Sequence, residues 1–422
     1  MQYVLFALAL QVVAIHVPVP GISGREMDAL LTGKLRGALG LLDLFSGGAL
    51  KNFSVTAMGI LPYINASIVM QLLTVAVPSL EKMAKEGGES GRKEINKYTR
   101  MLTLALAIFQ GTLLCVTLRS QGGLFVGISG FMLYLKMFQI VLAITAGTAF
   151  LLWLGESITE KGIGNGVSII IFGNIMVRLP SNFGELWALY VGGTVSILQI
   201  AALVVTFVAV TAIVVAMVQA VRKVPVQHAR RVVGGGKVTA GGSTFLPFKV
   251  NSSGVMPIIF AMALLALPAT LGGVAPGKAG EFFATVARDL QPGLTVTGIL
   301  ACLVYTIVIM GFTYFYTAVM MNIPEMSDNL KKWNAFIPGI RPGKDTTAYL
   351  DRVMTRITLA GAIFLSGIAL VQYLAPAVLR IPSGAFSLYG GTSLLIVVGV
   401  ALETMQAIEA QLMMRHYEGF IK

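Results

Sequence analysis

Long apolar stretches recur along the chain at a length that is typical of membrane-spanning helices. An α-helix rises 1.5 Å per residue, so about 20 apolar residues cross the ~30 Å hydrocarbon core of a bilayer. Ten stretches approach or meet this length, at 1–17, 57–77, 101–118, 131–154, 163–180, 194–221, 254–271, 296–321, 353–374 and 386–408. The pattern predicts an all-α polytopic membrane protein with ten transmembrane helices.

The composition supports this class. Hydrophobic residues make up 56% of the chain and charged residues only 12%, about half the charged share of a soluble protein. Cys115 and Cys302 both lie inside apolar stretches, so we expect two buried small hydrophobes rather than a disulfide. The first stretch lacks a basic start and an A-x-A exit, which favours a spanning helix over a cleavable signal peptide.

Lys and Arg are distributed unevenly between the two sides. With the N-terminus inside, 21 of the 31 basic residues fall in or beside the inner loops and 10 on the other side. The positive-inside rule therefore predicts that both termini are cytoplasmic. The net charge of +12 follows mostly from this bias, and a polybasic membrane or nucleic-acid site is the secondary interpretation.

Two inner loops are long, at about 222–253 and 322–352. The first contains no acid, and two alternating stretches around a Gly-rich turn predict a β-hairpin. In the second loop, Pro338-Gly339 and Pro342-Gly343 predict turns that hold Arg341 at a rigid tip. The basic residues of the first loop are Arg222, Lys223, Arg230, Arg231, Lys237 and Lys249.

A shorter apolar piece, at about 37–50, precedes the second span. Its 14 residues would make a helix of roughly 21 Å, too short to cross. The polar residues Lys51 and Asn52 follow before the apolar chain resumes at Ala57. A re-entrant half-helix inside protein and an interfacial helix on the outer surface both explain such a piece.

No catalytic constellation is evident, so we predict that the chain is not an enzyme and needs no cofactor. The stretch "GGGKVT" has Val238 where a phosphate loop needs Ser or Thr, and "GIGNG" at 162–166 follows no predicted strand. A secondary transporter is the alternative, but the middle of nearly every span lacks an ionisable residue, and Glu403 lies toward the inner end of its span. An intramembrane enzyme would need a buried nucleophile, acid pair or metal set.

Several long motifs resemble the SecY family, the channel subunits of the bacterial preprotein translocase. They are "GILPYINASIVMQLLTV", "KEGGESGRKEINKYTR", "LAIFQG", "EKGIGNGVSIIIF", "FKVNSSGVMPIIFA", "FIPGIRPG" and "YGGTSLLIVVGVALETMQAIEAQLMMRHYEGF", spread over nearly the whole chain. "VPVPGI" also matches, but family members usually begin with a basic amphipathic segment and carry an Arg about where Val12 and Val13 lie. We therefore expect a shortened or divergent start.

The resemblance implies two halves around a central pore, residues 1–180 with spans 1 to 5 and residues 181–422 with spans 6 to 10. It implies that 37–50 is a plug, and that the second and seventh spans form a lateral gate in which Asn65 and Gln71 could lie. Interhelical hydrogen bonding is the equal alternative for these two residues. By resemblance, the pore ring consists of Ile60, Ile64, Ile171, Ile175, Ile259 and Ile396, and the plug includes Leu41, Leu42, Asp43, Leu44, Phe45, Ser46 and Gly47.

The resemblance also implies a function. A SecY-like chain would conduct unfolded preproteins with signal sequences across the bacterial cytoplasmic membrane and release hydrophobic segments into the membrane lipids. Its partners would be SecE-type and SecG-type small subunits, a SecA ATPase motor and the ribosome. The motor and the ribosome would dock on the two long loops, through Arg222, Lys223, Arg230, Arg231, Lys237 and Arg341, and the basic loops could contact ribosomal RNA.

Overall fold

The computed structural model describes residues 2–20, 46–120, 130–228, 232–233, 237–238, 243–272, 278–379, 381 and 391–418. The helices are α1 Gln2–Ile15, α4 Leu61–Ala76, α5 Pro78–Glu86, α6 Gly88–Ser120, α7 Phe131–Lys161, α8 Gly166–Val191, α9 Ile197–Gln219, α10 Met256–Gly272, α11 Lys278–Asp289, α12 Val296–Met320, α13 Ile323–Lys332, α14 Lys344–Leu379 and α16 Gly391–Glu418. The strands are β1 Val221–His228, β2 Val232–Val233, β3 Lys237–Val238, β4 Ser243–Lys249 and β5 Ala335–Phe336.

Each of the ten predicted spans corresponds to a helix in this structure. Within the described residues, seven helices are long and apolar enough to cross a membrane, and α4 with α5 forms an eighth candidate that is bent by 103°. The apolar parts of α1 and α10 are shorter. The prediction of a polytopic all-α membrane protein is therefore confirmed.

Two predicted boundaries were wrong. The second span was expected to start at residue 57, but α4 begins at Leu61, because Gly59 has a φ of +57° and Pro62 favours a helix start at this point. The fifth span was expected to end at 180, but α8 continues through Pro180 to Val191. A proline inside a membrane helix is tolerated where neighbouring groups satisfy the freed carbonyl, so Pro180 was a poor stop signal.

The connection between α10 and α12 contains a helix that the sequence analysis did not predict. It contains α11, whose sequence "KAGEFFATVARD" carries four charged residues among apolar ones. The helix contacts α10 along its length. With 12 residues it is too short and too polar to span, and our search for long apolar stretches could not find it.

The two long inner loops join in one small sheet. β1 pairs antiparallel with β4 over seven residue pairs, from Val221 with Lys249 to Gln227 with Ser243, which confirms the predicted hairpin. β5 comes from the second loop and pairs with the other edge of β1, so the strand order is β4-β1-β5. An apolar cluster beneath the sheet includes Val224, Phe248 and Leu350. The sequence did not predict that the two loops share a sheet.

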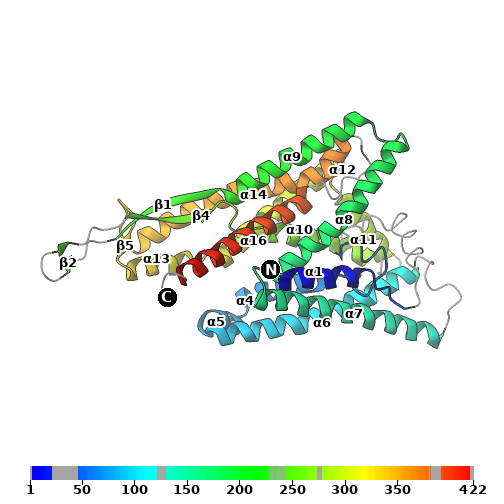
Figure 1. Cartoon of the computed structure of the whole chain (residues 1–422), viewed down its shortest axis with the longest axis horizontal. Coiled ribbons are helices and arrows are strands. Elements are labelled where there is room, and N and C mark those ends of the chain that lie inside the picture. Colours follow the sequence, from blue (N-terminus) through cyan, green and yellow to red (C-terminus); the bar gives the residue numbers. More distant parts are fainter. Residues whose placement is uncertain are drawn as a thin grey trace.

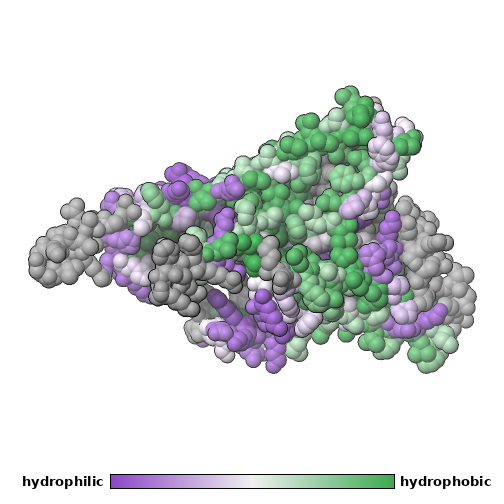
Figure 2. Space-filling view, viewed as in Figure 1, coloured by the Kyte–Doolittle hydropathy of each residue, from purple (hydrophilic) through white to green (hydrophobic). Residues whose placement is uncertain are grey.

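The two long inner loops, α5 and the C-terminal end of α16 lie toward one end of the molecule (Figure 1). In Figure 1, the hairpin, α13, α5 and the C-terminal end of α16 all point toward the left of the view, whereas α11 and the α8–α9 connection lie toward the right. Figure 2 shows a broad hydrophobic zone over the middle of this face and hydrophilic patches toward both ends. This arrangement matches a helix bundle whose middle faces lipid.

The described residues just before α4, 46–60, pack against α6 and α7. Leu50 and Phe53 are fully buried in an apolar cluster with Leu118 of α6 and Ile144 of α7. Backbone hydrogen bonds tie this segment to the chain after α1, from Val19 N–H to the Phe53 carbonyl and from Val55 N–H to the Val17 carbonyl, both 2.9 Å. Residues 49–58 are therefore a fixed part of the structure.

The close approach of this segment to α7 gives a stability prediction. A Cβ added at Gly147 would lie 2.0 Å from the Val55 carbonyl oxygen, so Gly147→Ala must push the segment off α7. We expect a loss of roughly 2–3 kcal/mol of stability, as for other overpacked sites. Thermal unfolding in detergent, followed by a thiol-reactive dye that reaches the buried Cys115, would measure it.

The matched control for this prediction is Gly367→Ala in α14, where a Cβ meets nothing within 4 Å. This variant should unfold at nearly the wild-type temperature. Equal unfolding temperatures for the two variants would contradict the packing argument.

Candidate functional site

Six isoleucines that the resemblance assigned to a pore ring are all buried in one apolar cluster. They are 0–5% exposed, and they come from the start of α4, from α8, from α10 and from α16. The same cluster also receives side chains from α1, α9, α12 and α14. The structure thus brings four sequence-distant segments together at the centre of the bundle, with only aliphatic side chains from the six positions: Ile60, Ile64, Ile171, Ile175, Ile259 and Ile396.

Local sequence fixes two of the pairs on one helix face each. Ile64 N–H donates to the Ile60 carbonyl at 3.1 Å, which places these side chains one turn apart at the start of α4. Ile171 and Ile175 are one turn apart on α8. The start of α8 is set by Asn165, whose side chain accepts from the Val167 and Ser168 N–H groups. This confirms that "GIGNG" is a tight turn that leads into a spanning helix.

The described end of the predicted plug lies inside the bundle. Leu41, Leu42, Asp43, Leu44 and Phe45 are outside the described residues, whereas Ser46 is 1% exposed and Ala49 and Leu50 are 0% exposed. A Cβ at Gly47 would lie 3.0 Å from the Asn174 Cα and carbonyl oxygen, so this turn rests on the middle of α8. The burial of residues 46–50 supports the re-entrant interpretation over a helix on the outer surface.

The seam assigned to a lateral gate has a limited interface. α4 contacts α10, but much less extensively than it contacts α6. Asn65 is half-buried, and the Gln71 Oε1 is buried with no hydrogen-bond partner among the described residues. Within the described part of the chain, neither side chain makes an interhelical hydrogen bond. The alternative role in interhelical hydrogen bonding therefore gains no support.

The described basic loop residues lie in three different places: on β1, on the turn after β5, and in the separate β2–β3 sheet. Arg222 and Lys223 are exposed on β1. Arg341 is exposed on a turn held by a 3.1 Å bond from Ile340 N–H to the Ile337 carbonyl and a 2.8 Å bond from the Thr346 hydroxyl to the Arg341 carbonyl. The backbone of Lys237 lies in β3. Arg230 and Arg231 are outside the described residues.

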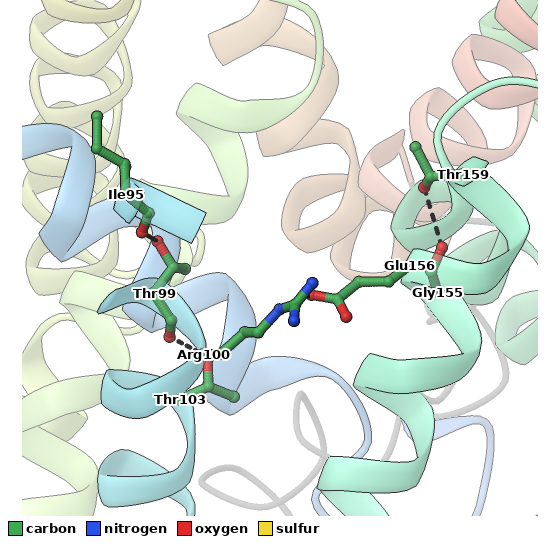
Figure 3. A network of polar contacts seen from close by, with 7 residues as sticks. All are labelled: Ile95, Thr99, Arg100, Thr103, Gly155, Glu156 and Thr159. Atoms are coloured by element: carbon green, nitrogen blue, oxygen red, sulfur yellow. Dashed lines mark hydrogen bonds and ion pairs between the residues drawn. The ribbon is translucent and has the colours of Figure 1, made fainter. Parts of the chain in front are cut away.

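An ion pair that the sequence analysis did not predict joins α6 to α7. Arg100 Nε and Glu156 Oε1 are 2.5 Å apart and point toward each other in Figure 3. Both belong to helices with threonines that bond back to carbonyls one turn earlier, such as Thr103 to Thr99 at 2.7 Å. Each residue is an unexceptional charge near the end of an apolar stretch, so no sequence signal pairs them.

The fold and this site define a polytopic helical membrane protein with a large buried apolar cluster among its helices, a buried segment before α4 that approaches α8, and a sheet with exposed basic residues at one end. Comparison with known proteins identifies the family. The SecY family model matches residues 54–405. The chain belongs to the SecY family.

Curated relatives match over nearly the full length. SecY subunits of protein translocase from Streptomyces galbus and Staphylococcus carnosus are 41% and 43% identical, and each alignment covers 99% of this chain and 95–96% of the relative. The Thermotoga maritima protein is 40% identical over 100% of this chain and 94% of its own.

Solved structures share the fold. A protein-conducting channel gives a TM-score of 0.65 at 17% identity, and Sec61 in the canine ribosome-channel complex gives 0.61 at 16%; each alignment covers 97% of this chain and 91% of the other. A SecY structure concerned with the plug domain and the membrane seal gives 0.68 at 17% identity, with the same coverage.

Proposed function

We propose that this chain is the channel subunit of a protein translocase. It conducts unfolded preproteins across the membrane and releases hydrophobic segments into the lipid. The observation that carries this proposal is the set of six buried isoleucines from four segments in one cluster, in a chain of the SecY family. Branched aliphatic side chains offer no hydrogen bonds to water or ions, yet they adjust around any passing peptide. A secondary transporter would need a polar substrate site there, which these six residues do not provide.

The direct test is cross-linking of a stalled preprotein that carries one cysteine. In a background with Cys115→Ala and Cys302→Ala, a cysteine in place of Ile175 should form a disulfide with the stalled chain. A cysteine in place of Val205, which is 67% exposed on α9, is the matched control and should not. Cross-linking at position 205 but not at 175 would overturn the assignment of the pore.

The resting channel is closed by the re-entrant segment at 37–50. Its described end, residues 46–50, is mostly buried and approaches α8 at Gly47, where an added Cβ would lie 3.0 Å from the Asn174 backbone, next in sequence to Ile175. Lateral release occurs between α4 and α10, because their small interface can part at the lowest cost. Asn65 and Gln71 lie on the α4 side of this seam.

Energy comes from partners, since the chain supplies no nucleotide site of its own. A SecA-type motor or a ribosome docks on the joined sheet and the turn after β5, through Arg222, Lys223, Arg230, Arg231, Lys237 and Arg341. Such a cluster of exposed cations suits acidic protein surfaces and ribosomal RNA. SecE-type and SecG-type subunits complete the complex in the bacterial cytoplasmic membrane.

Both termini and the joined sheet face the cytoplasm. A cysteine replacing Lys332, exposed on α13, should react with a membrane-impermeant thiol reagent only after the cytoplasmic side is opened. A cysteine replacing Val296, which is 87% exposed at the start of α12, should react from outside intact cells. The reverse labelling pattern would show that the orientation is wrong.

A further inference from the structure

Two carboxamides meet inside the otherwise apolar contact between α1 and α8. Gln11 and Asn174 are each 1% exposed. Gln11 Nε2 donates to the Ile170 carbonyl at 2.8 Å and also to Asn174 Oδ1. Gly173 makes room for this contact, since a Cβ there would lie 2.8 Å from Leu8 and 3.2 Å from the Gln11 Oε1.

The hydrogen bonds fix the orientation of both side chains. A backbone carbonyl can only accept, so the Gln11 amino group must face Ile170, and its second hydrogen then faces Asn174. The Gln11 Oε1 is left buried without a partner among the described residues. Burying a carboxamide with an unpaired oxygen costs free energy, so we take its remaining hydrogen bonds to have a role in positioning the helices that they join.

The two hydrogen bonds from Gln11 act on the part of α8 that carries Ile171 and Ile175. Asn174 lies between Ile171 and Ile175 in the sequence, and Ile170, the other acceptor, directly precedes Ile171. The bonds from Gln11 therefore set the rotation of α8 about its axis, and with it the direction of the two isoleucines. The backbone of Asn174 also packs against Gly47, which has a φ of +71°.

We propose that the Gln11–Asn174 pair is a positioning element that joins α1, the pore-lining part of α8 and the end of the re-entrant segment, and thereby stabilises the closed channel. The inference rests on the proposed function, because it assumes that Ile171 and Ile175 line the pore. It deepens that function by naming the residues that seat the segment.

Paired substitutions separate this role from a purely structural one. Gln11→Leu or Asn174→Leu removes the hydrogen bond between the two side chains and places a leucine against the remaining amide, so both should lower thermal stability. The double variant removes both amides, so its stability should recover. The resting ion conductance of the double variant in planar bilayers should nevertheless be about threefold to tenfold above that of wild type. This is the shift expected when the closed state of a closed–open equilibrium loses one interhelical hydrogen bond. Defective signal sequences should also be exported more readily.

The re-entrant side of the contact offers a second, matched test. Gly47→Ala and Gly48→Ala carry the same backbone strain, with φ values of +71° and +86°. Only the new methyl at position 47 would press on Asn174, whereas at 48 the nearest atom is 3.9 Å away on the Arg178 side chain. Conductance should rise in the first variant much more than in the second.

The outcomes distinguish this inference from the function on which it rests. If wild type shows no conductance that depends on a translocating peptide, the proposed function fails. If wild type conducts but the stable double leucine variant has wild-type leak and stringency, the pair only packs α1 on α8 and our inference is overturned. Equal leak in the two glycine variants would also contradict it.

Discussion

We expect that changing Ile64, Ile171, Ile175 and Ile396 together to serine will raise the resting ion conductance of the reconstituted channel by about tenfold or more. The side chains are 2–5% exposed, in one cluster from three helices. An aliphatic constriction excludes ions because water inside it has no hydrogen-bond partners, and four hydroxyls supply such partners. The closed state also loses its packing, so export of preproteins with defective signal sequences increases. Single-channel recording and an export assay measure the two effects.

The control for this prediction is a pair with the same burial and spacing elsewhere. Leu350 and Met354 are one turn apart on α14, 0% and 3% exposed, and belong to the apolar cluster beneath the sheet, away from the six isoleucines and from Leu50. Changing them to serine should destabilise the protein about as much as changing Ile171 and Ile175, but without a leak. A folded quadruple variant with wild-type conductance would show that these four isoleucines are ordinary packing residues.

We expect charge reversal at Arg341 to abolish most motor-driven export while leaving the protein folded. The guanidinium is exposed, and the turn is held by backbone bonds that do not involve it, so Arg341→Glu removes a contact without disturbing the loop. A guanidinium can bind a carboxylate with two parallel hydrogen bonds, which an ammonium cannot. ATP-dependent translocation into inverted vesicles should fall by about tenfold or more, and Arg341→Lys should give an intermediate loss.

Lys344→Glu makes the same change of charge three positions later, at an exposed residue that begins α14. If the loop acts only through its net charge, the two reversals should be equally harmful. We expect Lys344→Glu to retain most activity. Normal export in Arg341→Glu would rule out the proposed contact.

The fold was largely predictable because run length is a strong signal for membrane helices. Ten apolar stretches became ten helices, and the alternation around 222–253 became β1 and β4. The sequence did not reveal β5, because a pairing of only two residues, Ala335 and Phe336, leaves no pattern. The extension of α8 beyond Pro180 was missed since the neighbours that tolerate a proline are distant in sequence.

The candidate site was less accessible to pattern reasoning. Isoleucine is common on lipid-facing and packed helix surfaces alike, so only the family resemblance selected the six positions. Gln11 and Asn174 were overlooked, although each is a carboxamide in an apolar stretch, which is a usable signal in a membrane protein. Their pairing depends on how α1 crosses α8, and that crossing is a property of the fold as a whole.

The edge pairing of β5 with β1 has a mechanical consequence. β1 starts two residues after the last residue of α9, and the turn with Arg341 lies between β5 and the start of α14. A pull applied at that turn is therefore shared between α9 and α14 through the sheet, instead of bending one loop on its own. A partner that pulls on this turn would therefore transmit force to two helices, α9 and α14, at once.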